Sequence, residues 1–223
     1  MNLAERAYME LYPGKKIEHS ISLKYSGKFK AYNANVRMRG DNLIFNLSKS
    51  WRKVSKEIQI GLIQSLLIKV LKDKKKTTNM DLYDIFMKKV HLIVPKTNID
   101  SVLEKSFDRV NEGFFYGLVE KPNLVWGSNS RMKLGSYEYG TDTITISSIF
   151  RNARKELLDY IMYHEVLHKK HKFYSKNGRS YHHTREFRKK EKEFPDREEI
   201  ERAIKALTKR FWKLKISKPF WKI

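Results

Sequence analysis

The amino-acid sequence predicts an α+β protein, in which groups of short strands are followed by helices. Residues 19–48 and 124–150 alternate apolar and polar side chains and are interrupted by glycines, which is typical of strands joined by turns. Other segments place apolar residues three and four positions apart, as helices do. Forty per cent of the 223 residues are hydrophobic and 13% are aromatic, which is enough to form a packed core.

The first part of the chain contains a helix, a group of strands and a second helix. The stretch NLAERAYMELY (residues 2–12) predicts a short helix that ends before a Pro-Gly pair. Residues 19–48 predict antiparallel strands with turns at Gly27 and Gly40. The run EIQIGLIQSLLIKVL (residues 57–71) is apolar on nearly every side, so we expect a buried helix there.

The second part begins after the lysine-rich stretch KDKKKTTN (residues 72–79), which predicts an exposed loop. Residues 101–115 have helical spacing, residues 124–150 predict three strands, and residues 154–171 predict a long helix. A last helix follows Pro195, with acids in its first turn, bases in its last turn and one apolar stripe that consists of Ile200, Ala203, Ile204, Leu207 and Phe211.

The chain is strongly basic and lacks cysteine. Its 47 Lys and Arg against 25 Asp and Glu give a net charge of +22, which attracts polyanions, nucleic acid first, although a merely solvated lysine-rich surface is the alternative. Without cysteine, disulfides, thiolate nucleophiles and Cys-ligated zinc or iron–sulfur sites are excluded, so any metal must bind His, Asp or Glu. No apolar run approaches the ~20 residues of a membrane span, so we expect no membrane partner and a soluble, cytoplasmic location.

The motif HEVLH lies within the predicted helix over residues 154–171. Side chains four residues apart project from one helix face, so His164 and His168 can bind one metal ion. Glu165 points to a neighbouring side, where it can take a proton from a water molecule without binding the metal itself. The motif therefore predicts a metal site with Glu165 as its catalytic base.

A catalytic zinc site usually has three protein ligands, so a third residue is required. The candidates are His171, His182, His183 and Glu186. We expect His171 to be a surface residue, because it lies two helical turns beyond His164. The Asn-Gly turn at residues 177–178 would bring the chain back, and we choose His183, with His182 as the alternative ligand or as a supporting group.

Residues 101–195 resemble the SprT-like zinc metallopeptidases, a family that includes the bacterial SprT and eukaryotic Spartan proteases. The resemblance rests on five segments in the order and spacing of that family, LEKSFDRVNEGFF, PNLVWG, LGSYEYGTDTITIS, YHEVLH and HTREF. It implies a zincin-like fold, an antiparallel-rich sheet packed on helices, with the family's later histidine at His183 and its following aromatic residue at Phe187. It also implies proteolysis, in several relatives of proteins that are bound or crosslinked to DNA. The chain differs from that family in two respects. It has no Cys-ligated zinc module, and its first 100 residues match nothing in the family's catalytic unit.

We therefore predict an endopeptidase with Zn²⁺ held by His164, His168 and His183, although three histidines would also accept Mn, Co or Ni. Glu165 would accept the proton of the attacking water and deliver it to the leaving amine of a polypeptide substrate. The alternatives are a basic nucleic-acid-binding protein with a vestigial or structural metal site, and a general protease without a polynucleotide partner.

A basic stretch, residues 169–192, would form a positive rim beside this site and could bind DNA, bind acidic substrates or merely be solvated. The residues selected as nucleic-acid or substrate contacts are Lys169, Lys170, Lys172, Arg179, Arg185 and Arg188. In the C-terminal tail, aromatic residues interleave with lysines, which suits stacking on unpaired bases or docking on the domain; these are Trp212, Phe220 and Trp221.

We divide the chain into an N-terminal α+β region (residues 1–90), the peptidase domain (91–195) and a basic C-terminal helix and tail (196–223). The first two regions look alike at a shift of about 100 residues. In that comparison Glu57 matches Glu156, and the positions of His164, Glu165 and His168 are occupied by Ser65, Leu66 and Lys69. A true duplication would make the N-terminal region a degenerate, non-catalytic copy, whereas the alternative is a match between two unrelated strand-to-helix segments.

Overall fold

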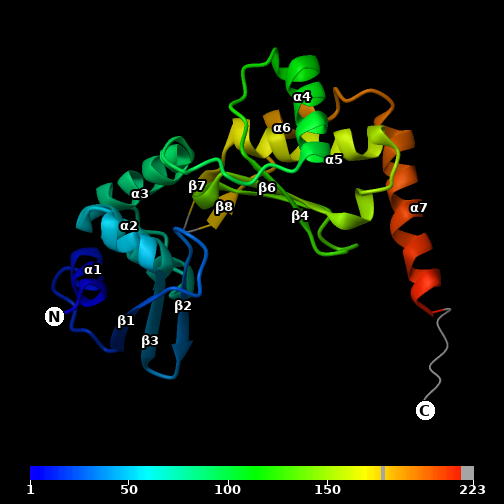
Figure 1. Ribbon diagram of the computed structural model, residues 1–223. Coiled ribbons are helices and arrows are strands. Elements are labelled where there is room, and N and C mark those ends of the chain that lie inside the picture. The colour runs from blue at the N-terminus through cyan, green and yellow to red at the C-terminus, as the bar shows by residue number, and fades with distance from the viewer. Residues whose placement is uncertain (177–178, 217–223) are drawn as a thin grey trace. The chain divides into compact units, whose positions relative to one another are not determined.

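The computed structural model describes residues 1–176 and 179–216, and their side chains except those of residues 174–176, 179–180 and 210–216. Within these residues the fold is α+β, with seven α-helices, two three-stranded mixed sheets and a short hairpin (Figure 1). The chain divides into two compact units. The first comprises Met1–Pro95, Tyr139–Asp142 and Phe173–His182, and the second comprises Lys96–Glu138, Thr143–Lys172 and His183–Ile223.

The first unit packs two helices on one face of a sheet. Its elements in chain order are α1 (Leu3–Leu11), β1 (Ser20–Ser26), β2 (Ala34–Arg39), β3 (Asn42–Ser48), α2 (Lys56–Val70) and α3 (Thr78–Lys89). Asn2 caps α1 and forms a capping box with Glu5, which explains why the helix begins there. Alternation along β3 turns Leu43, Phe45 and Leu47 into a core that they share with α1 and α2. The helix predicted over residues 57–71 is confirmed as α2, whereas α3 was not predicted.

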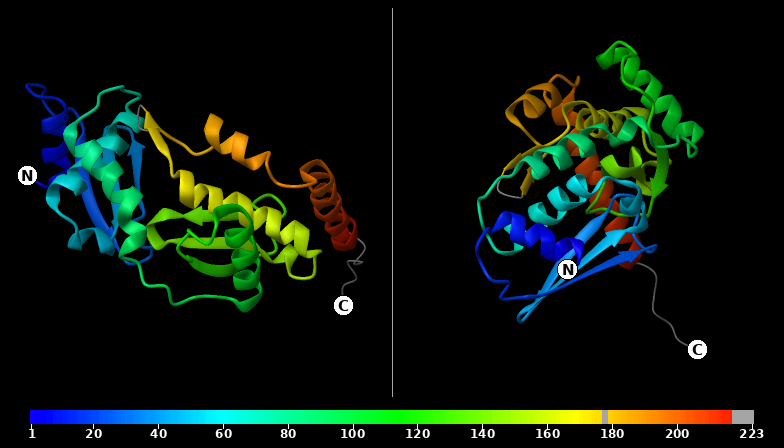
Figure 2. Two further views of the ribbon diagram at one scale, coloured as in Figure 1. Left: turned by 90° about the horizontal axis from the view of Figure 1, so that it is seen from above. Right: turned by 90° about the vertical axis from the view of Figure 1, so that its left-hand side faces the viewer.

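The second unit repeats this plan. Its elements are α4 (Ser101–Phe115), β4 (Asn123–Gly127), β5 (Gly135–Glu138), β6 (Thr143–Ser147), α5 (Lys155–His171), α6 (Arg185–Glu191) and α7 (Arg197–Ile216). Helices α4 and α5 pack on each other, and each also contacts strands of the sheet (Figure 2). The predicted stripe of α7 packs on the same core through Ile200 and Ile204. The described stripe residues therefore confirm the prediction, and the side chain of Phe211 lies outside the described residues, as does the tail with Trp212, Phe220 and Trp221.

The expectation of antiparallel strands is wrong for one pair in each sheet. The strand orders are β1-β3-β2 and β4-β6-β5. Strand β3 pairs parallel with β1 and antiparallel with β2, and β6 pairs in the same way with β4 and β5. Alternation of side chains has the same period in parallel and antiparallel strands, so the sequence pattern carries no information about direction.

The two units agree in the positions at which corresponding elements begin and end. Strands β3 and β6 end at Ser48 and Ser147, and helices α2 and α5 begin at Lys56 and Lys155, so both pairs lie 99 positions apart. Trp51 and Phe150, which correspond at this shift, are both buried after the strand. The agreement supports the interpretation of a duplication, which stays a prediction.

No α-helix of the described part of the chain combines the length and the apolar character that crossing a membrane requires.

Candidate metal centre

Helix α5 presents the HEVLH motif from a firmly held position. Its buried face includes Leu158, Met162 and Val166, which belong to the core of the second unit. The hydroxyl of Tyr163 donates a hydrogen bond of 2.6 Å to the backbone carbonyl of Lys190, so α5 is tied to the end of α6. The adjacent face of α5, which carries His164 and His168, is therefore held in a fixed position.

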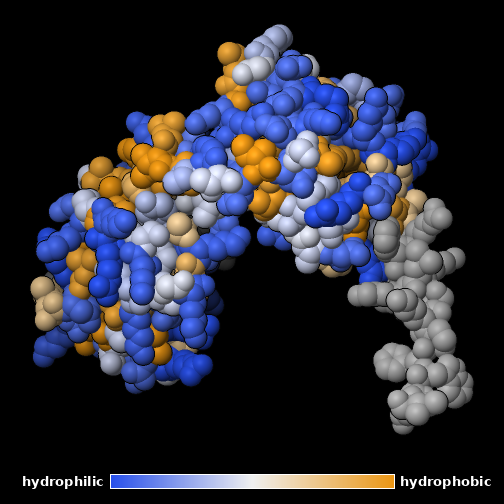
Figure 3. All heavy atoms as spheres, viewed as in Figure 1, coloured by the Kyte–Doolittle hydropathy of each residue, from blue (hydrophilic) through white to orange (hydrophobic). Residues whose placement is uncertain are grey.

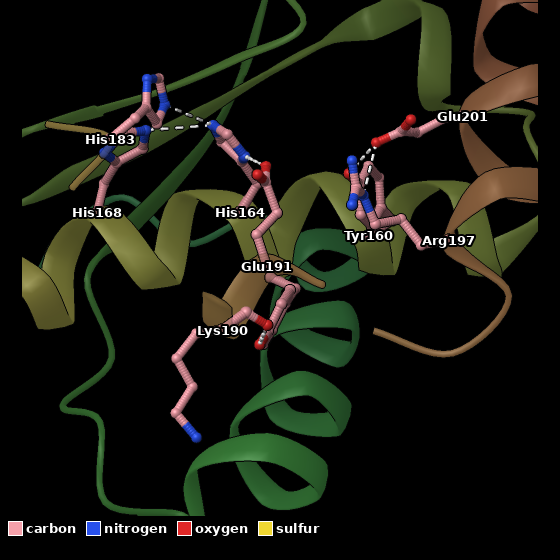
Figure 4. Close-up of polar contacts among 9 residues, drawn as sticks. Tyr160, His164, His168, His183, Lys190, Glu191, Arg197 and Glu201 are labelled. Carbon is pink, nitrogen blue, oxygen red and sulfur yellow. Dashed lines mark hydrogen bonds and ion pairs between the residues drawn. The ribbon is translucent and has the colours of Figure 1, made fainter. Parts of the chain in front are cut away.

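Three imidazoles converge at this face, as Figure 4 shows. The Nε2 atom of His164 lies 3.2 Å from Nε2 of His168 and 3.4 Å from Nε2 of His183. One nitrogen of each of the three rings lies within 4.8 Å of those of the others. The structure thus brings together the three histidines that the sequence selected.

The spacing of these nitrogens fits a metal ion. A tetrahedral zinc ion with Zn–N distances of 2.0–2.1 Å requires ligand nitrogens about 3.3 Å apart. Two neutral imidazoles that face each other can share only one proton, so three converging nitrogen atoms are best satisfied by a cation. We conclude that the donor set suits zinc.

His183 reaches the site because the chain returns after α5. Strands β7 (Tyr174–Lys176) and β8 (Arg179–Tyr181) pair antiparallel, as a hairpin requires, although the predicted turn residues Asn177 and Gly178 lie outside the described residues. Thr184 then caps α6 by accepting a hydrogen bond from the backbone N–H of Phe187. His183 stands directly before this cap.

Phe187 packs against all three imidazoles. Its ring is fully buried, and its centroid lies 5.2, 4.7 and 4.8 Å from those of His164, His168 and His183. An apolar residue four positions after His183 therefore restricts the orientations of the three rings.

Glu191 is a functional residue that was not predicted from the sequence. Its Oε1 atom lies 2.6 Å from Nδ1 of His164. Burial lowers the pKa of His164, but the hydrogen bond that its Nδ1–H donates to Glu191 and the charges of Glu165 and Glu191 outweigh this effect, so the pKa is raised overall. The hydrogen bond with His164 holds the pKa of Glu191 below its usual range, so the carboxylate accepts and Nδ1–H donates. This leaves Nε2 of His164 free to bind a metal.

A spacing signal for Glu191 existed in the sequence. His183, Phe187 and Glu191 are four residues apart, which places Phe187 and Glu191 on one face of α6. The prediction used only the first two members of this series.

Glu165 is buried beside the histidines. Its side chain is only 4% exposed, and its Oε2 atom has no hydrogen-bond partner among the described residues. Burial raises its pKa to about 7, against the opposing charges of His164 and Lys133 and a hydrogen bond from the Tyr137 backbone. A carboxylate of this kind exchanges a proton near neutral pH.

A cavity of about 480 Å³ opens in front of this group. One wall is the start of β5 with Gly135, the floor includes His164 and Glu165, and the other wall is formed by α6 and α7. On α7, Glu201 accepts hydrogen bonds from Tyr160 and Arg197, at 2.9 and 2.8 Å (Figure 4). The cavity is therefore shaped by helix α5, an edge of the sheet and helix α7 together.

The alternative ligands do not join the three histidines. His171 is half-buried rather than a surface residue, and its ring lies 6.2 Å from Phe187. His182 lies among the aromatic residues of the first unit, near Tyr139 and Phe173. Glu186 is exposed on α6.

Only some residues of the predicted basic rim are exposed to solvent. The prediction that Lys169 contacts nucleic acid or substrate at an exposed rim is wrong. The residue is only 7% exposed, and its ammonium group lies 6.0 Å from the ring centroid of Tyr137. It points toward the sheet because it follows His168 on α5, one step around the helix. Lys170 is exposed, Lys172 is half-buried, and the side chain of Arg179 lies outside the described residues. Arg185 and Arg188 are exposed and line a groove of about 800 Å³ beside His183, together with Glu186, Lys189 and Lys192.

Comparisons with known proteins give a weak similarity to a solved structure. No protein-family model matches the chain, and no curated protein matches it. Among solved structures, the chain is similar to the crystal structure of the metallopeptidase zymogen of Methanocaldococcus jannaschii jannalysin, with 23% sequence identity and a TM-score of 0.37. This similarity covers 51% of the present chain and 95% of the other.

Proposed function

We propose that this protein is a zinc-dependent endopeptidase of the SprT-like type. The observation that carries the proposal is the meeting of three imidazole nitrogens, one of which belongs to His164, a residue that lines a cavity together with the buried carboxylate of Glu165. His164, His168 and His183 would hold the ion. When bound, zinc supplies Lewis acidity, which polarises a peptide carbonyl and lowers the pKa of a water molecule.

Glu165 performs the proton transfers. With a pKa of about 7, its carboxylate can accept a proton from the attacking water and later give it to the leaving amine. Its Oε2 atom has no protein partner among the described residues, so it is available for this exchange. Glu191 keeps Nε2 of His164 directed toward the other imidazoles throughout.

The sheet edge offers a place for the polypeptide. Strand β5 is a terminal strand of its sheet, in the order β4-β6-β5, and a terminal strand is where an extended peptide can add to a sheet. Gly135, at the start of β5, lines the cavity next to Glu165. A substrate strand added at this edge would therefore pass the catalytic carboxylate.

Substitution of Glu165 by Gln tests the proposal. The amide cannot accept the proton, so we expect casein hydrolysis to fall by about 10²-fold or more, the scale of general-base catalysis. Bound zinc, measured by elemental analysis, should stay at the level of the unsubstituted protein. The exposed Glu193→Gln variant is the matched control and should retain activity. Full activity in Glu165→Gln, or an unsubstituted protein that binds no zinc, would contradict the assignment.

A second candidate function, association with nucleic acid, is favoured by the groove on α6. Four cations and one acid line it beside His183, so a polyanion bound there would lie close to the peptidase site. We propose proteins associated with DNA as the substrate class. Stimulation of casein hydrolysis by added DNA would support this, and unchanged hydrolysis over a range of DNA concentrations would favour a general protease.

A further inference from the structure

The outer face of the sheet in the first unit carries polar and basic residues, whereas most apolar side chains of its strands face the opposite side, toward α1 and α2. Within the unit, α1 and α2 contact the strands and share the apolar core with their inward residues. Tyr25 points inward, because its hydroxyl donates a 2.6 Å hydrogen bond to Gln59 of α2. Residues at alternate positions must point outward. We define the outer face by these residues: Ser20, Ser22 and Lys24 of β1; Asn35, Arg37 and Arg39 of β2; and Asn42, Ile44 and Asn46 of β3.

Pairing places these residues in rows across the sheet. Lys24 pairs with Asn46, which pairs with Asn35, and the two asparagines are joined by a hydrogen bond of 3.1 Å. The next row contains Arg37 and the last contains Arg39. Arg37 and Arg39 are therefore about 7 Å apart along one strand, and Lys24 lies two strands and one row away from Arg37, at about 12 Å.

The three cations of this face are available for a ligand. Lys24, Arg37 and Arg39 are exposed, and no salt bridge to any of them occurs within the described residues. The outer face itself contains no acid, and the nearest one along the chain is Asp41 in the turn between β2 and β3. Figure 3 shows that hydrophilic residues cover much of this unit's visible surface.

We propose that the outer face binds the phosphate backbone of nucleic acid. Arg and Lys combined with Ser and Asn are the side chains that typically contact phosphates, and arginine binds them with two parallel hydrogen bonds. The face has no aromatic residue for stacking on bases, so the binding should be independent of sequence. It also lacks protruding apolar side chains that would insert into a membrane, since Ile44 is half-buried between its polar neighbours.

The site differs from the groove on α6 and does not depend on peptidase activity. The experiment uses the full chain with Lys24, Arg37 and Arg39 replaced by Ala. The matched control removes the same charge elsewhere in the unit, from the exposed Lys53, Lys56 and Lys69 on and before α2, and both variants keep every α6 cation.

Binding is measured by fluorescence anisotropy with labelled single- and double-stranded oligonucleotides over a range of salt concentrations. Loss of three phosphate contacts should reduce the slope of log K against log salt by about two to three. The control should change it by less than about one. A charge-preserving variant, with Lys24→Arg, Arg37→Lys and Arg39→Lys, should retain most of the slope.

Circular dichroism and the unfolding temperature show whether each variant is folded, and if the Ala variant is not, a triple Gln variant replaces it. Equal losses in the face variant and the control would overturn the proposal, as would an unchanged slope in the face variant. Absence of oligonucleotide binding by the unsubstituted protein would overturn it too. Binding of anionic phosphatidylserine vesicles that depends on the face, with oligonucleotide binding unaffected, would assign the face to membranes instead.

Discussion

At the scale of single residues, Glu191 holds His164, one of the three proposed zinc ligands, by a hydrogen bond with its Nδ1 atom. Its carboxylate fixes the Nδ1–H form of His164, so Glu191→Gln should lower zinc affinity by about 10- to 100-fold. Competition with a fluorescent zinc chelator measures this loss. Glu193→Gln serves as the control, since Glu193 pairs only with Lys190 at the exposed surface in the described residues. Equal zinc affinity in the two variants would show that Glu191 has no positioning role.

Gly135 has a similar role toward Glu165. A Cβ atom at position 135 would lie 2.4 Å from Oε1 of Glu165 and 2.9 Å from its Cγ, so an alanine must displace the carboxylate. We expect Gly135→Ala to lower peptidase activity by about 10-fold or more, the scale that small misplacements of catalytic groups produce. Bound zinc should be unchanged.

Gly113→Ala is the matched control for Gly135→Ala. Gly113 is exposed on α4, and a Cβ there would contact nothing within 4 Å. Alanine at this helical position should raise stability by about 0.5–1 kcal/mol without changing activity. If both glycine variants keep full activity, the contact of Gly135 with Glu165 does not matter for catalysis.

At the scale of elements, the packing of α3 on α2 depends on one glycine. A Cβ at Gly61 would lie 1.8 Å from the backbone carbonyl oxygen of Asn79, so the two helices could not keep their present distance. Gly61→Ala should therefore lower the free energy of unfolding by about 1–3 kcal/mol, the usual cost of overpacking. Urea unfolding followed by circular dichroism measures it, and Gly113→Ala should shift the midpoint in the opposite direction.

Position 61 also marks a difference in helix packing between the two units. At a shift of 99 residues Gly61 corresponds to Tyr160, which lines the cavity of the second unit, and Ser65 corresponds to His164. In the first unit α3 packs closely at Gly61, where the second unit has an open cavity. The interpretation as a non-catalytic copy therefore has a physical basis in helix packing as well as in the missing histidines.

At the scale of the whole molecule, zinc should couple the site to stability. The three histidines come from α5 and from the segment before α6, so an ion that binds them holds two elements together only when the chain is folded. A zinc concentration 100 times the Kd should stabilise the protein by about 2.7 kcal/mol. Differential scanning fluorimetry should show an unfolding temperature several degrees higher in zinc than in EDTA.

Two variants separate metal binding from catalysis in this experiment. His183→Ala should lose most of the temperature shift, because it removes the ligand that links the two elements. Glu165→Gln should keep the shift. An identical unfolding temperature in zinc and EDTA for the unsubstituted protein would contradict the metal site.

The sequence by itself determined helices α1, α2, α4, α5 and α7, the alternating strands and the histidines that meet. These follow from local periodicity and spacing, as in the HEVLH motif, and such signals survive without knowledge of distant contacts. The predicted bounds of α2, α4 and α5 differ from the observed ones by no more than a residue or two at each end.

Only the tertiary structure decided the features that join distant segments. Side chains alternate every two residues in both parallel and antiparallel strands, so the sequence could not predict the parallel pairing of β1 with β3. The burial of Lys169 depends on where Tyr137 lies. The hydrogen bond between Glu191 and His164 joins residues 27 positions apart in the sequence. Glu165 likewise fits closely against Gly135, which lies 30 positions before it. Contacts of this kind are set by packing and chain return, which local propensity does not encode.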